Sequence, residues 1–157
     1  MTHTVERYHD ISTGHRVHGH ESKCAHLHGH NYRITFTCAY APRSQRRFFG
    51  QTDMVNPELD NLGRVVDFSV IKATLCQWLE DNWDHKFLVW EMDPLADTLA
   101  NLDPLGLVRV PFNPTAENMA EHLVNVIAPQ LLKGSDVALV ACKVEETRKC
   151  SATYILS

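Results

Sequence analysis

The sequence predicts an α+β protein in which two helices cover one face of a four-stranded antiparallel sheet, in the chain order β-β-α-α-β-β. The first observation is a period-two alternation of apolar and polar side chains over residues 31–40, typical of a strand with one buried face. The second is a pair of segments, at about residues 69–82 and after residue 114, with apolar side chains at helical spacing. The third is a predicted strand over residues 137–147, followed after a two-residue turn by another over residues 151–156.

The first two strands are expected to form a hairpin. Residues 4–11 are the weaker strand, which ends near His15 because Gly14 and a run of polar residues interrupt it. A histidine-rich loop over residues 16–27 then leads into the clear strand at residues 31–40. The alternating apolar side chains of that strand are Tyr32, Ile34, Phe36, Cys38 and Tyr40.

Turn-forming and basic residues dominate residues 41–64, which we interpret as an extended loop. A connection this long is uncommon unless it covers a site or joins a partner subunit. The first helix follows at about residues 69–82, with Asp67 or Ser69 as its N-cap. Its apolar stripe consists of Ile71, Leu75, Trp78 and Leu79.

Several prolines occur in residues 91–113, which we predict to be loop. The second helix begins after Pro114, with Thr115 as its N-cap and Glu117 in its first turn, where a carboxylate suits the helix dipole. Pro129 is expected to distort or end this helix.

Composition limits the possible classes of protein. The 157 residues are 44% hydrophobic and show no repeat of domain length, so we expect a single domain over residues 1–157. The net charge of −4 gives no electrostatic reason to expect binding to nucleic acid or to a membrane. The five cysteines are odd in number and scattered, and the first residues lack an apolar secretion segment. Both features favour a reducing, cytoplasmic location.

Six of the ten histidines lie between residues 15 and 30, and two of them are spaced like metal ligands. His28 and His30 stand at i and i+2 where a strand begins, so their imidazoles share one side of the backbone. His15, at the end of the preceding strand, is the predicted third ligand, with His18 and His20 as alternatives. Three imidazoles with an open fourth position predict a catalytic Zn²⁺ site, and the alternative is a set of loop histidines without a metal.

Cys24 precedes His28 by four residues and has three interpretations. It could ligate the zinc, pack as an inert apolar side chain, or react beside the ion. Lys23, His26 and a nearby dication would lower the pKa of a thiol toward neutrality, and a thiolate with such a pKa is a good proton acceptor. Cys24 is therefore a candidate catalytic base.

Asp84 and His85 follow the first helix directly. They are either a polar helix end or a proton relay in which the Asp84 carboxylate orients and polarises the His85 imidazole.

Glu146 lies near the end of a predicted strand, on the face that also carries Val140, Cys142 and Val144. A carboxylate on an apolar face needs a partner. That partner is either a cation in the turn at residues 148–149 or a ligand that offers two parallel N–H donors.

These motifs, in this order, resemble the 6-pyruvoyl-tetrahydropterin synthase / 6-carboxy-tetrahydropterin synthase family. The resemblance covers the chain except residues 41–62, and its landmarks are His15, Lys23-Cys24, His28-Gly29-His30, residues 63–68, Asp84-His85-Lys86, residues 114–118 and Glu146-Thr147. The three residues between Cys24 and His28 resemble the bacterial carboxy-tetrahydropterin branch, which favours the 7-deazaguanine (queuosine) pathway over biopterin synthesis.

The resemblance implies a role for each candidate residue. The implied set comprises the zinc ligands His15, His28 and His30, the catalytic residues Cys24, Asp84 and His85, and the substrate-binding residues Glu146 and Thr115. Cys24 would act as the base and Asp84 with His85 as an acid/base relay. Glu146 would bind the 2-amino and N3 hydrogens of the pterin ring, and Thr115 would add a contact to the ring.

The resemblance also implies a reaction and an assembly. The reaction is carbon–carbon lysis of 7,8-dihydroneopterin triphosphate to 6-carboxy-5,6,7,8-tetrahydropterin, acetaldehyde and triphosphate. The fold is the tunnelling fold, assembled as a hexamer of two trimers with active sites shared between chains. Two alternatives stand beside this reaction: pyruvoyl-type elimination of triphosphate without carbon–carbon cleavage, and zinc binding without catalysis.

Overall fold

The computed structural model of the protein describes residues 3–41 and 59–156. Most of the predicted loop over residues 41–64 lies outside the described residues, and its described end, residues 59–64, forms turns and bends. Among the residues described, no helix is both long and apolar enough to span a membrane.

One mixed sheet of six strands organises the described chain, in the spatial order β4-β3-β1-β2-β5-β6. The strands are β1 (Thr4–His15), β2 (His28–Tyr40), β3 (Phe87–Trp90), β4 (Leu107–Val110), β5 (Val137–Thr147) and β6 (Cys150–Ile155). β2 is antiparallel to β1 and β5, and β5 is antiparallel to β6. β3 is parallel to both β1 and β4. The α+β class is confirmed, but the prediction of a four-stranded antiparallel sheet is wrong because two parallel strands extend it.

The missed elements lie in one segment, residues 87–110. β3 and β4 contain four residues each, which is too short for a recognisable alternation. The helix α3 (Ala96–Leu102) lies between them, so the prediction of loop over residues 91–113 is wrong for α3 and β4. Pro94 and Pro104 occupy the turns on either side of α3 and leave these elements intact.

Both predicted hairpins are present. β1 and β2 pair along their whole length, and the register places His15 opposite His28 at the end that carries the histidine-rich loop. At the same end, Gly14 and His15 pair with β3 on the other side of β1. β5 and β6 pair across the turn at residues 148–149.

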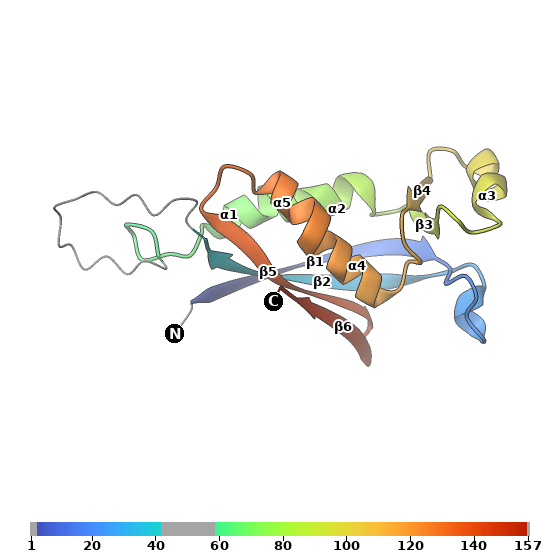
Figure 1. Ribbon diagram of the computed structural model, residues 1–157, viewed down its shortest axis with the longest axis horizontal. Helices are drawn as coiled ribbons and strands as arrows, with labels where there is room; N and C mark the ends of the chain where they lie inside the picture. The colour runs from blue at the N-terminus through green and yellow to red at the C-terminus, as the bar shows by residue number, and fades with distance from the viewer. Residues whose placement is uncertain (1–2, 42–58, 157) are drawn as a thin grey trace.

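Two helical segments cover one face of the sheet (Figure 1). The first consists of α1 (Phe68–Ile71), η2 (Lys72–Cys76) and α2 (Gln77–Asn82), and the second of α4 (Ala116–His122), η3 (Leu123–Ile127) and α5 (Ala128–Leu131). Asp67 and Thr115 are their N-caps, each accepting a backbone hydrogen bond with its side chain. The π-helical turn η3 ends two residues before Pro129, and proline lacks the N–H that α-helical bonding needs. The second helix is therefore distorted there but continues.

The core lies between the sheet and these helices. As the alternation predicts, Tyr32, Ile34, Phe36 and Cys38 of β2 are fully buried. They pack against Ile71, Leu75, Leu79, Met119 and Leu123 of the helical segments. A slip of one residue would turn this apolar face toward solvent, so burial fixes the register of β2. The same register fixes His28 and His30 on the side of the sheet that faces the helices.

Candidate functional site

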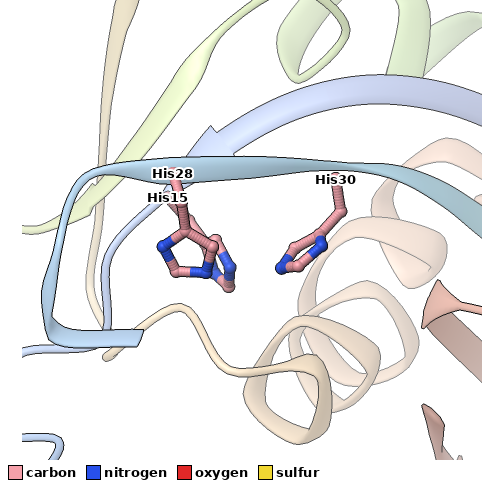
Figure 2. A group of neighbouring side chains, drawn as sticks. All are labelled: His15, His28 and His30. Atoms are coloured by element: carbon pink, nitrogen blue, oxygen red, sulfur yellow. The ribbon is translucent and has the colours of Figure 1, made fainter. Parts of the chain in front are cut away.

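Three histidines from the two strand ends converge. The ring centroids are 4.5 Å apart for His15 and His28, 5.2 Å for His15 and His30, and 5.0 Å for His28 and His30. One potential ligand atom from each residue lies within 4.8 Å of the other two. Figure 2 shows the three rings on the same side of the strands, pointing toward a common space. The predicted trio is thus grouped by the hairpin.

Hydrogen bonds set the tautomers of two of these rings. His15 Nδ1 donates to the carbonyl of Pro114 at 2.7 Å, and His28 Nδ1 donates to the carbonyl of His26 at 2.8 Å. A neutral imidazole with Nδ1–H keeps its lone pair on Nε2, and such a bond to the second nitrogen is the usual support of a metal-bound histidine. Both rings therefore present Nε2 as a ligand atom.

Burial favours the neutral form of two of these rings, His15 and His30. Burial lowers the pKa of His15 to about 4 and also lowers the pKa of His30. Within the described residues, the Nε2 atoms of His15 and His30 are buried without a hydrogen-bond partner. Buried, unpaired nitrogen lone pairs are costly unless something binds them. The donor set therefore fits a divalent metal that accepts imidazole nitrogen.

The alternative ligands His18 and His20 lie outside this trio. The ring of His18 is 6.1 Å from the ring of Trp90, and His20 Nδ1 accepts a hydrogen bond from the Ser22 N–H at 2.9 Å. Between them, Gly19 has a φ of 80°, so the segment turns instead of continuing a strand. The segment His18-Gly19-His20 therefore belongs to the histidine-rich loop and does not continue a strand.

A cavity of about 330 Å³ adjoins the trio at His15, a size within the usual range for small-molecule sites. Its polar lining is formed by His15, His20, Cys24, Thr115, Glu117 and Glu146, together with Cys150 and Ser151. Cys24 is half-buried on the short 3₁₀ segment η1 (Lys23–Ala25) and is not grouped with the histidines as a ligand. Cys24 thus lines the same cavity as His15. Sequence reasoning missed Cys150 as a lining residue, although the alternation of β6 could have found it.

Two β-bulges in β5 correct the predicted surroundings of Glu146. The first leaves Val140 without a partner on β2, so Leu139 replaces it on the buried face with Cys142 and Val144. The second lies between residues 145 and 147 and leaves Glu146 without a partner on β6. Bulges of this kind redirect a side chain, and here the Glu146 carboxylate lines the cavity.

The Glu146 carboxylate lies among the site residues. Its Oε1 is 3.9 Å from His15 Nε2, and the described residues show no ion pair between Glu146 and either Arg148 or Lys149. Burial, with the adjacent Glu146 charge, raises the pKa of the Tyr32 hydroxyl well above its ordinary value. The carboxylate therefore keeps acceptor capacity that a ligand with N–H donors could use.

Thr115 has two roles in this region. Its side chain accepts a hydrogen bond from the Asn118 N–H at 3.3 Å as the N-cap of α4, and the residue also lines the cavity. Its predicted N-cap position is confirmed.

Asp84 and His85 form the predicted hydrogen-bonded pair. Asp84 Oδ2 accepts from His85 Nδ1 at 2.8 Å, and Asp84 Oδ1 accepts from the Ser12 N–H at 2.8 Å. Although burial alone would raise it, these hydrogen bonds bring the pKa of Asp84 below its ordinary value. The ionised carboxylate fixes the proton on His85 Nδ1 and leaves Nε2 as a proton acceptor. The His85 side chain is 81% exposed.

This pair borders a second cavity of about 1120 Å³, which includes Ser12, Arg33, Arg148 and Glu146 but not Cys24. His85 and Cys24 therefore line different cavities within one chain. Glu146 lines both cavities and lies between them.

Fold and site together define an α+β protein with three converging imidazoles beside a cavity of substrate size. The family model described as 6-pyruvoyl tetrahydropterin synthase matches residues 4–156, and the chain belongs to this family. The resemblance read from the motifs is confirmed.

Relatives and solved structures agree with this assignment. The chain is 32% identical to 6-carboxy-5,6,7,8-tetrahydropterin synthase of Rickettsia felis over 90% of this chain and 91% of the relative. It is 31% identical to the probable 6-carboxy-5,6,7,8-tetrahydropterin synthase of Halobacterium salinarum, over 90% of this chain and 79% of the relative. The crystal structure of an uncharacterized Wolinella succinogenes protein shares the fold, with a TM-score of 0.77, 21% identity and coverage of 100% and 99% of the two chains. Caenorhabditis elegans 6-pyruvoyl tetrahydropterin synthase shares it with a TM-score of 0.59, 20% identity and coverage of 100% and 97%.

Proposed function

We propose that the protein is a zinc-dependent lyase that converts 7,8-dihydroneopterin triphosphate to 6-carboxy-5,6,7,8-tetrahydropterin, acetaldehyde and triphosphate. The observation that carries the proposal is the grouping of His15, His28 and His30 beside a cavity lined by Cys24 and Glu146. The names of the relatives that match most of the chain support the carboxy product over the pyruvoyl product.

The metal would be held by His15, His28 and His30 through imidazole nitrogen. When bound, a dication with three neutral ligands acidifies the hydroxyl groups of a ligand that reaches it. Zinc is the metal that this ligand set favours, because its structural and catalytic sites commonly use histidine nitrogen in tetrahedral geometry.

Glu146 would orient the substrate. Its carboxylate has two oxygens that can accept parallel hydrogen bonds from the 2-amino group and N3–H of a pterin ring. Thr115, which lines the same cavity, would add a contact to the ring. Cys24 would remove a proton from the substrate side chain, because this residue lines the same cavity and a thiolate is a good proton acceptor.

Asp84 and His85 would complete the proton transfers from a neighbouring chain. Within one chain they border a different cavity from Cys24, and the exposed His85 ring is available to another subunit. This division supports the assembly of two trimers with active sites shared between chains. It would also pair the open edges of the sheet, which otherwise favour uncontrolled association.

Product analysis tests the proposed reaction. Purified protein is incubated with 7,8-dihydroneopterin triphosphate, and the products are identified by mass spectrometry together with an assay for acetaldehyde. Release of acetaldehyde and 6-carboxy-5,6,7,8-tetrahydropterin is the expected result. Triphosphate release without acetaldehyde would replace the proposal with pyruvoyl-type elimination, and zinc binding without any turnover would leave a non-catalytic zinc protein.

A further inference from the structure

The five cysteines fall into two groups. Cys38, Cys76 and Cys142 are buried in the core, and burial raises the pKa of each thiol, which makes these thiols poor nucleophiles. Cys24 is half-buried and Cys150 is exposed, and both line the cavity of about 330 Å³. Cys150 has no part in the proposed reaction.

The direction of the Cys150 side chain follows from the strand that carries it. In β6, residues 150, 152 and 154 share one face because side chains alternate along a strand. Ala152 lines the same cavity, and Tyr154 Oη accepts a hydrogen bond from Asn125 Nδ2 of the second helical segment at 2.9 Å. This face is therefore turned toward the helices and the cavity.

Cys24 reaches the cavity from the histidine-rich loop. Its carbonyl accepts a hydrogen bond from the Val17 N–H at 2.8 Å, which holds the 3₁₀ segment η1 against another lining residue. Lys23 precedes Cys24, and Arg148 and Lys149 precede Cys150, so each thiol has cationic neighbours in the chain.

We propose that Cys24 and Cys150 form a two-thiol modification site, which peroxide oxidants convert to an intramolecular disulfide. The Cys24 thiolate attacks one peroxide oxygen and becomes a sulfenic acid, while the other oxygen leaves and takes up a proton as water. The Cys150 thiolate then attacks the Cys24 sulfur and displaces the sulfenic oxygen as a second water. In total, two thiols and one hydrogen peroxide give one disulfide and two waters.

The link would close the cavity reversibly. It joins the histidine-rich loop to β6 across the space that Thr115 and Glu146 border, so a pterin could no longer enter. A disulfide requires Cα atoms within about 7 Å, so the link forms only when the loop and the strand approach to that distance. The loss of pterin binding rests on the proposed function, whereas formation of the link does not.

Peptide mapping without reduction tests the site. Zinc-loaded protein is treated with hydrogen peroxide, free thiols are alkylated under denaturing conditions, and the digest is examined by mass spectrometry. The expected species joins the Cys24 and Cys150 peptides, is lighter than their sum by two hydrogen atoms, and disappears on treatment with dithiothreitol. Cys38, Cys76 and Cys142 should be recovered alkylated, which makes them internal controls.

Two variants test whether the link depends on the Cys150 thiol. Cys150→Ser should abolish the linked peptide and let Cys24 proceed to the irreversible sulfinic acid, whereas Cys76→Ala should leave the link unchanged. Overoxidised Cys24 without the linked peptide in the wild-type protein would overturn the inference, as would a link between two chains instead of within one. A linked peptide in a protein that fails to turn over pterin triphosphate would refute the proposed function alone.

Discussion

His15 and His28 face each other directly across the β1–β2 hairpin, with their ring centroids 4.5 Å apart. Directly opposed residues of an antiparallel pair hold their side chains at short and fixed distances. The apolar face of β2 sets the hairpin register, so the packing of Tyr32 and Ile34 determines where the imidazoles meet. The candidate metal centre is thus a product of strand pairing, and the loop between the strands supplies the thiol.

Cys24→Ala separates the roles of base and ligand. Because the thiol lines the cavity beside the histidine trio without joining it, we expect the variant to keep its zinc. The turnover rate should fall about 100-fold or more, the usual effect of losing a positioned proton acceptor. Metal analysis and steady-state kinetics on the same preparation check both parts. Full activity in the variant would remove Cys24 from the reaction, and loss of zinc would make it a ligand.

Glu146→Ala should abolish pterin binding and leave zinc content unchanged. The carboxylate would supply both acceptors for the ring, and its removal leaves two N–H donors of a buried pterin unpaired. Glu145→Ala is the matched control, because the neighbouring carboxylate instead forms an ion pair with Lys143 at 3.1 Å. Calorimetric titration with 7,8-dihydroneopterin measures both variants. Equal affinities would show that the carboxylate at position 146 does not anchor the ring.

Thr115→Ala should lower the free energy of unfolding by about 1 kcal/mol, the typical value of an N-cap hydrogen bond. The side chain of Thr115 accepts from the Asn118 N–H at the start of α4, and alanine cannot replace it. Thr115→Ser retains the hydroxyl and should keep most of the stability. Urea unfolding followed by circular dichroism compares the three proteins, and an unchanged midpoint for Thr115→Ala would exclude the capping role.

Ionisation of Asp10 should make the free energy of unfolding depend on pH. The hydrogen bond from the Arg33 guanidinium, at 2.8 Å, holds the pKa of Asp10 below its usual value in the folded protein. The contribution of the ionised Asp10 to the free energy of unfolding is therefore fully present above the unfolded-state pKa. This contribution is lost as the pH falls through the lower folded-state pKa. Lowering the pH from about 5 toward 2 should destabilise the wild-type protein more than Asp10→Asn. Parallel pH profiles of the two proteins in thermal unfolding would contradict this assignment.

Long, periodic elements could be predicted from the sequence, and short or irregular ones could not. The alternation in β2 and the caps Asp67 and Thr115 are local signals, and each appears in the fold where it was expected. The four-residue strands β3 and β4 show no period of their own and exist through pairing with β1 and with each other.

The same distinction applies to the candidate site, where some relationships could be predicted from the sequence and others could not. His15, His28 and His30 could be grouped because a hairpin relates them by register. By contrast, the bulge that redirects Glu146 depends on how β5 meets β6. That His85 and Cys24 line different cavities depends on how their segments pack in the fold. Neither relationship has a local signal in the sequence.

Metal content of the wild-type protein and of His15→Ala tests the central claim most directly, because the only role proposed for the buried His15 ring is to hold the metal. We predict one zinc per chain in the wild-type protein and none in His15→Ala, with His18→Ala retaining the full complement. Equal zinc in His15→Ala and the wild-type protein would contradict the claim that these strand ends form the metal centre.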